Sequence, residues 1–424
     1  MFLKSLHLVN YRGFADHQLS FEQASENSNK TKIRKTTILL GNNGTGKSNI
    51  LKAIGLVLAG RDALPELLGE PESWIRLGQK QCEIHAVIQT KEDEERNLSI
   101  QIKKNDEVSD VLDRNRESLS ELESALEHTN RSYFTLGYGA TRRLNIERRL
   151  RSKSSPLRHL RAQNIGSLFS PEAMLTPIES WAMDMDYQGN KGAVSTIKRV
   201  MSDFLNGVQF SRIDKKSGSL MFKTPEGEVP MNLLSDGYQN VAAWVGDLLY
   251  RTTETFQDYK SPLNTRGVLL IDELEAHLHP NWQKELLAFL ESRLPNFQIV
   301  TTTHSPVIAQ QAKSGELFYL ERKGKSLDLH GFVGNPQSLL LHQLIMSDAF
   351  GMDSDESFEL TKKKARFEKL SQRSALSANL QNEMDGLKEE LETGPMRARS
   401  NSTVSQEQAV LLQKIQSELE KITS

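Results

Sequence analysis

The feature that most constrains the fold is a ten-residue stretch near the start of the chain. Residues 39–48 read LLGNNGTGKS and match the phosphate-binding pattern G-x-x-x-x-G-K-[ST]. The apolar run 37–40 predicts a buried strand, and the helical spacing of apolar residues over 49–58 predicts a helix. A phosphate-binding loop requires this strand–loop–helix context, so the sequence indicates an α/β fold built around a nucleotide site.

This loop carries the groups that a bound nucleoside triphosphate needs. Its small residues let backbone N–H groups turn toward the phosphates, and the start of the following helix adds partial positive charge. Lys47 is expected to reach the β- and γ-phosphates of ATP, and Ser48 to ligate Mg²⁺. The predicted nucleotide contacts from this loop are Asn42, Asn43, Gly44, Thr45, Gly46, Lys47, Ser48 and Asn49.

A second signal lies at residues 267–273, GVLLIDE. Four consecutive apolar residues predict a strand buried on both faces, as in a parallel sheet. Two carboxylates follow at its carboxyl end, where open α/β sheets bind their ligands. Asp272 is placed to hold Mg²⁺ through water, and Glu273 to orient or deprotonate an attacking water. A helix-capping acid is the alternative interpretation.

Four further residues are candidates for the same site. His304 follows the apolar strand 297–303 and could donate to the γ-phosphate. Arg12 could reach bound nucleotide, or it is a surface arginine in a turn. Gln89 ends a predicted strand and could touch the metal or its water. Ser235 precedes a long helix, and the residues alone indicate a helix cap.

The amino-acid composition excludes several classes of protein. The 424 residues carry a net charge of −2 and a single cysteine, Cys82, which excludes an internal disulfide framework and fits a reducing cytoplasm. No run approaches the roughly 18 apolar residues of a membrane span, and the N-terminus lacks a signal-peptide pattern. We expect a cytoplasmic protein.

The pattern along the chain divides it into four parts. We predict an N-terminal half of the ATPase head (1–105), a helical and basic insertion (106–205), a C-terminal half (206–335) and a helical coiled-coil tail (336–424). Residues 142–161 hold eight basic residues against one acid, which favours DNA binding or, equally, a solvated loop or a surface for an acidic partner. In the tail, apolar residues step by three and four at Leu380, Met384, Leu387 and Leu391, and again at Leu412, Ile415, Leu419 and Ile422.

The order of the motifs resembles that of the ABC-type ATPase heads of SMC, RecF and OLD-family proteins, over roughly 1–105 and 205–335. The motifs are the phosphate loop, Leu234-Ser235-Asp236-Gly237, Asp272-Glu273 and Thr303-His304-Ser305-Pro306. The resemblance implies a mixed core sheet with an antiparallel β lobe. It also implies that Lys47 and Ser48 bind phosphate and Mg²⁺, Asp272 binds the metal through water, Glu273 is the catalytic base, His304 senses the γ-phosphate, and Ser235 and Gly237 complete the site from a second subunit.

Two further sequence segments resemble those of a smaller group of ATPases. Residues 138–143 (YGATRR) and 277–283 (HLHPNWQ) are similar to small bacterial ATPases of anti-phage defence, the PtuA group of the Septu system, which acts with a separate HNH nuclease, PtuB. No nuclease site is visible in this sequence. The resemblance therefore implies a slow ATPase that forms a homodimer around ATP, or a higher homo-oligomer, and regulates a partner nuclease. The alternative is a DNA-repair ATPase like RecF or SMC that clamps DNA without a nuclease.

Overall fold

The computed structural model describes residues 2–24, 31–90, 93–128, 134–142, 157–205, 207–256, 262–324, 326–352, 356–373 and 377–393. The chain forms two compact units, Met1–Gly351 and Met352–Ser424. None of the helices in the described ranges combines the length and apolar character that crossing a bilayer requires.

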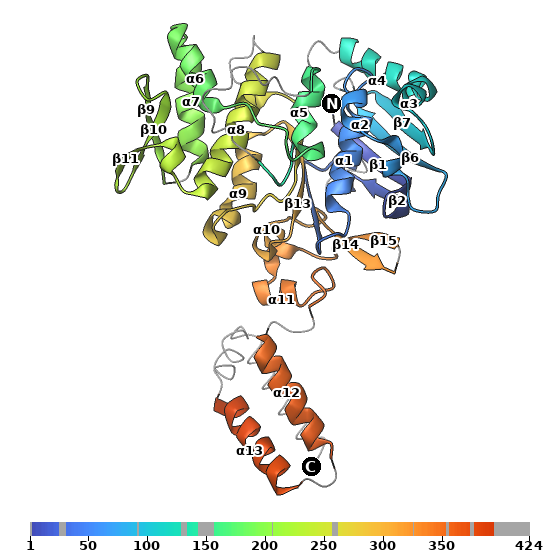
Figure 1. Ribbon diagram of the computed structural model, residues 1–424, viewed down its shortest axis with the longest axis vertical. Helices are drawn as coiled ribbons and strands as arrows, with labels where there is room; N and C mark the ends of the chain where they lie inside the picture. Colours follow the sequence, from blue (N-terminus) through green and yellow to red (C-terminus); the bar gives the residue numbers. More distant parts are fainter. Residues whose placement is uncertain are drawn as a thin grey trace. The chain divides into compact units, whose positions relative to one another are not determined.

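A six-stranded sheet forms the centre of the first unit (Figure 1). Its strands run parallel except at one edge, where β15 is antiparallel to β14. In spatial order they are β15 (Ser326–Gly331), β14 (Leu317–Lys323), β5 (Thr36–Gly41), β13 (Phe297–Thr303), β12 (Gly267–Ile271) and β8 (Thr135–Tyr138). The predicted α/β class is confirmed. The loops that follow β5, β13, β12 and β8 all leave the same edge of the sheet.

Continuous apolar runs form these strands because both faces of the sheet are covered. Ile38 and Leu269 belong to a core shared with helices α8 (Asp236–Thr255) and α9 (Pro280–Arg293). Their neighbours Leu39 and Leu270 belong to a second core, shared with α1 (Lys47–Val57) and α5 (Leu160–Phe169). Each strand therefore supplies both cores with alternate residues.

A four-stranded antiparallel sheet packs in the second core, in the order β2-β1-β6-β7. The strands are β1 (Phe2–Tyr11), β2 (Phe14–Ser20), β6 (Gln81–Gln89) and β7 (Glu95–Lys103). Strands β6 and β7 form an antiparallel pair. A short strand pair, β3 (Glu22–Ala24) and β4 (Thr31–Ile33), precedes β5. A further sheet is formed by β9 (Gln209–Asp214), β10 (Ser219–Thr224) and β11 (Gly227–Pro230).

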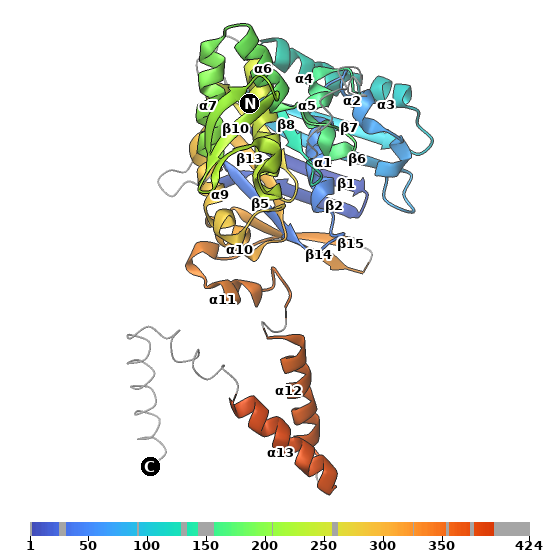
Figure 2. The same cartoon turned by 60° about the vertical axis from the view of Figure 1, so that its left-hand side comes forward.

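Part of the predicted insertion belongs to the core. Strand β8 pairs in parallel with β12, so residues 135–138 complete the central sheet. The other elements described within it are helices: α3 (Val108–Arg114), α4 (Arg116–His128), α5, α6 (Ile178–Tyr187) and α7 (Lys191–Phe204). Figure 2 shows α6 and α7 beside the β9–β11 sheet. Short helices α2 (Leu64–Leu68), α10 (Pro306–Gln310) and α11 (Leu341–Ile345) fill the connections.

The second unit contains two contacting helices, α12 (Phe358–Ser371) and α13 (Ala378–Thr393). Ion pairs join Lys363 to Glu390 and Arg366 to Glu383. The first predicted apolar seam lies on α13, and the second, from Leu412 to Ile422, lies outside the described residues. The predicted tail begins at residue 336, but residues 336–351, including α11, belong to the first unit.

Candidate nucleotide site

The phosphate loop folds as a turn that only glycine accommodates at two positions. Gly44 and Gly46 have φ angles of 75° and 86°, a region that residues with a side chain rarely adopt. A Cβ at Gly46 would also lie 2.7 Å from Cδ1 of Leu327. Between them, Thr45 Oγ1 donates to Asn42 O at 2.7 Å, and α1 starts directly after Gly46. The N–H groups of Asn49 and Ile50 donate to Gly46 O, so within the described residues Lys47 and Ser48 are left to offer the N–H groups of the first turn of α1 to the phosphate cradle.

Lys47 lies at the centre of this cradle. Its side chain is buried, and Nζ donates to Gly41 O at 2.7 Å and Asn42 O at 3.1 Å. Burial lowers the pKa of Lys47 to about 8, although the carboxylates of Asp272 and Glu273 oppose that shift. These carboxylates are therefore close enough to interact with the ammonium group. The two shorter of its hydrogen bonds go to carbonyls of the loop itself, and phosphate oxygens could replace them.

Thr302, on β13, fixes the two acids that follow β12. Its hydroxyl donates to Asp272 Oδ1 at 2.6 Å and accepts from the Glu273 N–H at 2.8 Å. Glu273 has a φ of 49°, an uncommon conformation for a residue with a side chain, which is found mostly where surrounding structure imposes it. Asp272 is 8% exposed, whereas Glu273 is half-buried. The paired acids thus emerge at the edge where Lys47 lies.

His304 also lies at this edge, with Nδ1 3.5 Å from Lys47 Nζ. Burial and the Lys47 ammonium lower the pKa of His304, which favours the neutral imidazole. Glu275, which the sequence analysis did not identify, holds the backbone here: its carboxylate accepts from the N–H groups of His304 and Ser305 and from Thr303 Oγ1. The D-E-x-E spacing of residues 272–275 places a third acid close to the paired acids. Nothing in the sequence, however, indicated which strand Glu275 would face.

Arg142 begins the basic run 142–161, for which we predicted DNA binding or, equally, a solvated loop or a surface for an acidic partner, and the burial of this residue contradicts all three for Arg142 itself. Its side chain is 6% exposed and lies against the acids. Nη2 donates to the carbonyls of Asp272 at 2.7 Å and Glu273 at 2.8 Å, because β8 neighbours β12 and releases the chain at the same edge. Of the others, Arg161 pairs with Glu123 at 2.9 Å and Arg158 is exposed, while Arg143, Arg148, Arg149, Arg151 and Lys153 lie outside the described residues.

Arg12 lies beside α1. Nη1 donates to Asn49 Oδ1 at 2.8 Å, and the guanidinium covers the ring of Trp74 at 4.1 Å from its centroid. Its Nε is buried and has no partner within the described residues. Arg12 and Asn49 therefore lie together beside the start of α1, and the nucleotide contact expected of each stays a prediction.

Gln89 was predicted near the metal, and the fold does not bring it there. Gln89 pairs with Phe2, the first residue of β1. The guanidinium of Arg266, which precedes β12, covers the ring of Phe2. Gln89 is therefore near the amino end of the central sheet, whereas Asp272 lies at its carboxyl end. The error arose because the sequence did not reveal the direction of β6 relative to the central sheet.

Ser235 and Gly237 lie at the start of α8. Ser235 is exposed and is the N-cap residue, yet its side chain makes no capping hydrogen bond, so the capping interpretation does not account for it. Gly237 is close to the loop after Glu273: a Cβ there would lie 2.7 Å from His277 O. Three residues after Ser235, the ring of Tyr238 lies 5.2 Å from that of Trp282. Within the described part of the chain the hydroxyl of Ser235 has no hydrogen-bond partner, so it is available to an external ligand.

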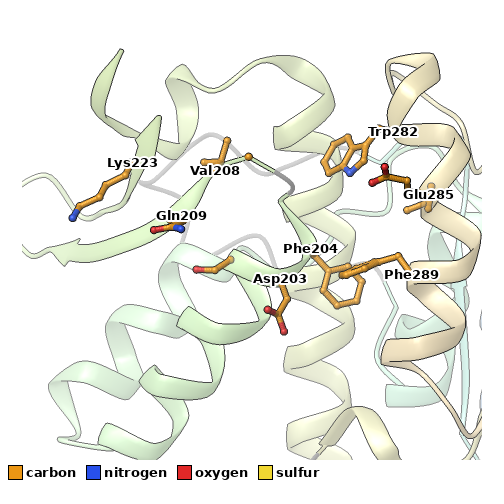
Figure 3. Close-up of a pocket in the computed structure, with 11 residues that line it drawn as sticks. Asp203, Phe204, Val208, Gln209, Lys223, Trp282, Glu285 and Phe289 are labelled. Carbon is orange, nitrogen blue, oxygen red and sulfur yellow. The ribbon is translucent and has the colours of Figure 1, made fainter. Parts of the chain in front are cut away.

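A cavity of about 470 Å³ is lined by Trp282, the residue that contacts Tyr238 (Figure 3). Trp282 and Phe289 of α9 form one wall, and Gln209 and Lys223 of the β9–β10 pair form another. None of the phosphate-loop residues and neither of the paired acids lines it. The cavity is therefore distinct from the candidate nucleotide site.

The residues present suit a triphosphate and a magnesium ion. A glycine cradle, a buried lysine and a helix N-terminus are anion-binding features. For the metal, Ser48 and Asp272 offer hard oxygen donors, which Mg²⁺ prefers. Thr302 occupies only one carboxylate oxygen of Asp272, and within the described ranges no hydrogen bond reaches Oδ2.

Comparison with known proteins agrees with this geometry. A family model described as "AAA domain, putative AbiEii toxin, Type IV TA system" matches residues 36–309. The Septu protein PtuA of Bacillus mycoides (strain KBAB4) is 25% identical over 354 residues, which are 83% of this chain and 45% of that protein. The retron Ec83 probable ATPase of Escherichia coli is 30% identical over 160 residues, 37% of this chain and 29% of that protein. The chain spans less than half the length of these curated relatives.

Among solved structures, an Smc head bound to the C-terminal winged-helix domain of ScpA aligns with 78% of this chain and 98% of its own, at a TM-score of 0.46 and 15% identity. The family assignment rests on the sequence model, which covers the phosphate loop, the paired acids and His304. This chain belongs to the AAA-domain family that the model describes, and it is a P-loop ATPase.

Proposed function

We propose that this protein is the ATP-hydrolysing subunit of a bacterial anti-phage defence complex, which dimerises head to head around ATP and regulates a separate nuclease. The proposal rests on the observation that the motifs lie in two places in the fold. Lys47, the paired acids and His304 gather at one edge of the central sheet, while Ser235 is exposed and its hydroxyl has no partner among the described residues. The exposed Ser235 therefore suits the site of a second copy.

Within one protomer, each residue has a role that follows from its position. Lys47 exchanges its carbonyl acceptors for phosphate oxygens. Glu273 accepts a proton from the attacking water, and neutral His304, which can accept from Lys47 at Nδ1, donates to the γ-phosphate at Nε2. Ser48 and Asp272 would hold Mg²⁺, which neutralises charge on the phosphate oxygens when bound.

The second protomer contributes Ser235 and the N-terminus of α8, with Gly237 allowing close approach. Helix N-termini attract anions, so the γ-phosphate would hold the two heads together. Its hydrolysis would weaken the dimer, and the dimer would then work as a switch.

A mixing experiment tests the shared site. Lys47→Ala inactivates a protomer's own site, whereas Ser235→Arg inactivates the site of its partner. In the mixed dimer both defects fall in one site, and the other site is intact. We expect each variant alone to lack ATPase activity and the mixture to recover it. Two inactive variants that stay inactive when mixed, although they form a mixed dimer by native mass spectrometry, would contradict the proposal.

The partner nuclease is proposed from the similarity to the Septu protein PtuA and from the PtuB-like HNH partner that this resemblance implies. The test is co-expression of the chain with the product of its neighbouring gene, followed by a plasmid-degradation assay with and without ATP. Degradation that requires ATP and an intact Lys47 supports a regulated nuclease. Retention of DNA without degradation would favour the RecF-like clamp instead, an alternative that the burial of Arg142 already weakens.

A further inference from the structure

Arg142 joins two parts of the protein that serve different nucleotide sites in the proposed dimer. One branch of its guanidinium, Nη2, binds the main-chain carbonyls of Asp272 and Glu273. The other branch, Nη1, donates to Asn240 Oδ1 at 3.2 Å. Asn240 lies on α8, five residues after Ser235, and is buried.

The guanidinium is planar and holds its donors in a fixed fork, so the two branches cannot move independently. Nε donates to Gly139 O at 3.3 Å and fixes the fork to the end of β8. Burial lowers the pKa of Arg142 to about 10, which still leaves it charged at neutral pH. Each bond is therefore charge-assisted and stronger than one between neutral groups.

The first turn of α8 has a second contact with the same loop. Gly237 packs against His277 O so closely that a Cβ would lie 2.7 Å from it. A shift of the chain after Glu273 would then move α8 through Arg142 and through this contact, and Ser235 would move with the helix.

We propose that Arg142 is a positioning residue that couples the paired acids of its own protomer to the helix that presents Ser235 to the partner's nucleotide. This inference rests on the proposed dimer and goes beyond it: occupancy of one site would change the affinity of the other. The coupled element is α8, which Arg142 contacts at Asn240.

The experiment measures steady-state ATPase rates against ATP concentration, with dimerisation followed by light scattering. We expect the wild type to show a Hill coefficient above 1. Asn240→Leu removes the acceptor while keeping similar volume, and should bring the coefficient to 1 with kcat changed by less than about threefold. Asn240→Asp keeps an acceptor and should retain cooperativity. A merely structural role for Asn240 would not separate these two variants.

Arg142→Lys keeps the charge but loses the fork, and should lower kcat by about tenfold or more, leave the ATP Kd within about threefold, and abolish cooperativity. The matched control is Arg34→Lys. Arg34 is also buried and donates to the carbonyls of Ser20 at 3.1 Å and Glu22 at 3.3 Å, so it tests loss of a buried fork elsewhere. It should leave kcat and the Hill coefficient unchanged.

The failure of this inference is distinguishable from failure of the proposed function. A wild type that dimerises with ATP and hydrolyses it without cooperativity, or an Asn240→Leu variant that remains cooperative, would overturn the coupling and leave the shared site intact. Absence of an ATP-dependent dimer in the wild type would remove the proposed function, and the coupling with it.

Discussion

The hydroxyl of Thr302 holds the side chain of Asp272 at 2.6 Å, although 30 residues separate them in the chain. The same oxygen accepts the N–H of Glu273 at 2.8 Å. One side chain on β13 therefore fixes both acids that follow β12. This relationship exists because the two strands are parallel neighbours.

Thr302→Val should lower kcat by about tenfold or more and leave the ATP Kd nearly unchanged, because it loosens the acids without touching the phosphate loop. Single-turnover hydrolysis and calorimetry would measure the two quantities. Thr301→Val is the matched control: Thr301 is equally buried on the same strand, but its hydroxyl donates to Ile271 O at 2.9 Å. Equal losses from both variants would contradict a specific role for Thr302.

Lys47→Ala should weaken ATP binding by about a hundredfold or more, since the buried ammonium is the cation at the centre of the cradle. Calorimetry measures the affinity, and a thermal melt checks that the fold is kept. Retained binding would mean that residues 41–48 do not form the phosphate site.

Glu273→Gln should lower kcat by about a hundredfold while leaving the ATP affinity intact, because the amide cannot accept the proton of the attacking water. The variant should therefore accumulate as an ATP-bound dimer, visible by size-exclusion chromatography with light scattering. An elution profile that ATP does not change would count against the head-to-head dimer.

Glu275→Gln tests the loop that carries His304. The carboxylate accepts from three donors in residues 303–305, and an amide would replace one of its acceptor atoms with a donor. We expect kcat to fall about tenfold or more with ATP binding retained. Glu285→Gln on α9, outside this loop, serves as the control and should leave kcat unchanged.

The ATP affinity should depend on pH in the alkaline range. The pKa of Lys47 in the free protein is about 8, below its ordinary value of 10.5, so the ammonium loses its proton above pH 8. Phosphate binding requires the charged form, so the Kd should rise by up to about tenfold per pH unit above pH 8. Folding has the opposite trend: the unfolded chain binds more protons between pH 8 and 10.5, so the free energy of unfolding should rise there.

Lys47→Arg is the control for this pH dependence, since arginine keeps its charge throughout the range. Calorimetry of ATP binding and urea unfolding at several pH values would follow both trends. An ATP affinity that is constant from pH 7 to 10 in the wild type would contradict the role of the lowered Lys47 pKa.

The local chemistry of the site was predictable from the sequence because each motif contains its own structural context. The glycines before Lys47 specify a turn, and the apolar run before Asp272 specifies a strand buried on both faces. Parallel strands place their carboxyl ends at one edge, so strand type alone placed Lys47, Asp272 and His304 at the same edge of the sheet.

The tertiary structure alone decided which strands are neighbours and in which direction each strand runs. Gln89 ends a strand and Arg142 follows one, yet Gln89 lies near the amino end of the central sheet and Arg142 lies against the acids. Thr302 and Glu275 gained their roles from the pairing of β12 with β13, a contact that no local spacing encodes. The physical reason is that residue patterns report local conformation and burial, whereas strand order depends on packing between segments far apart in the chain.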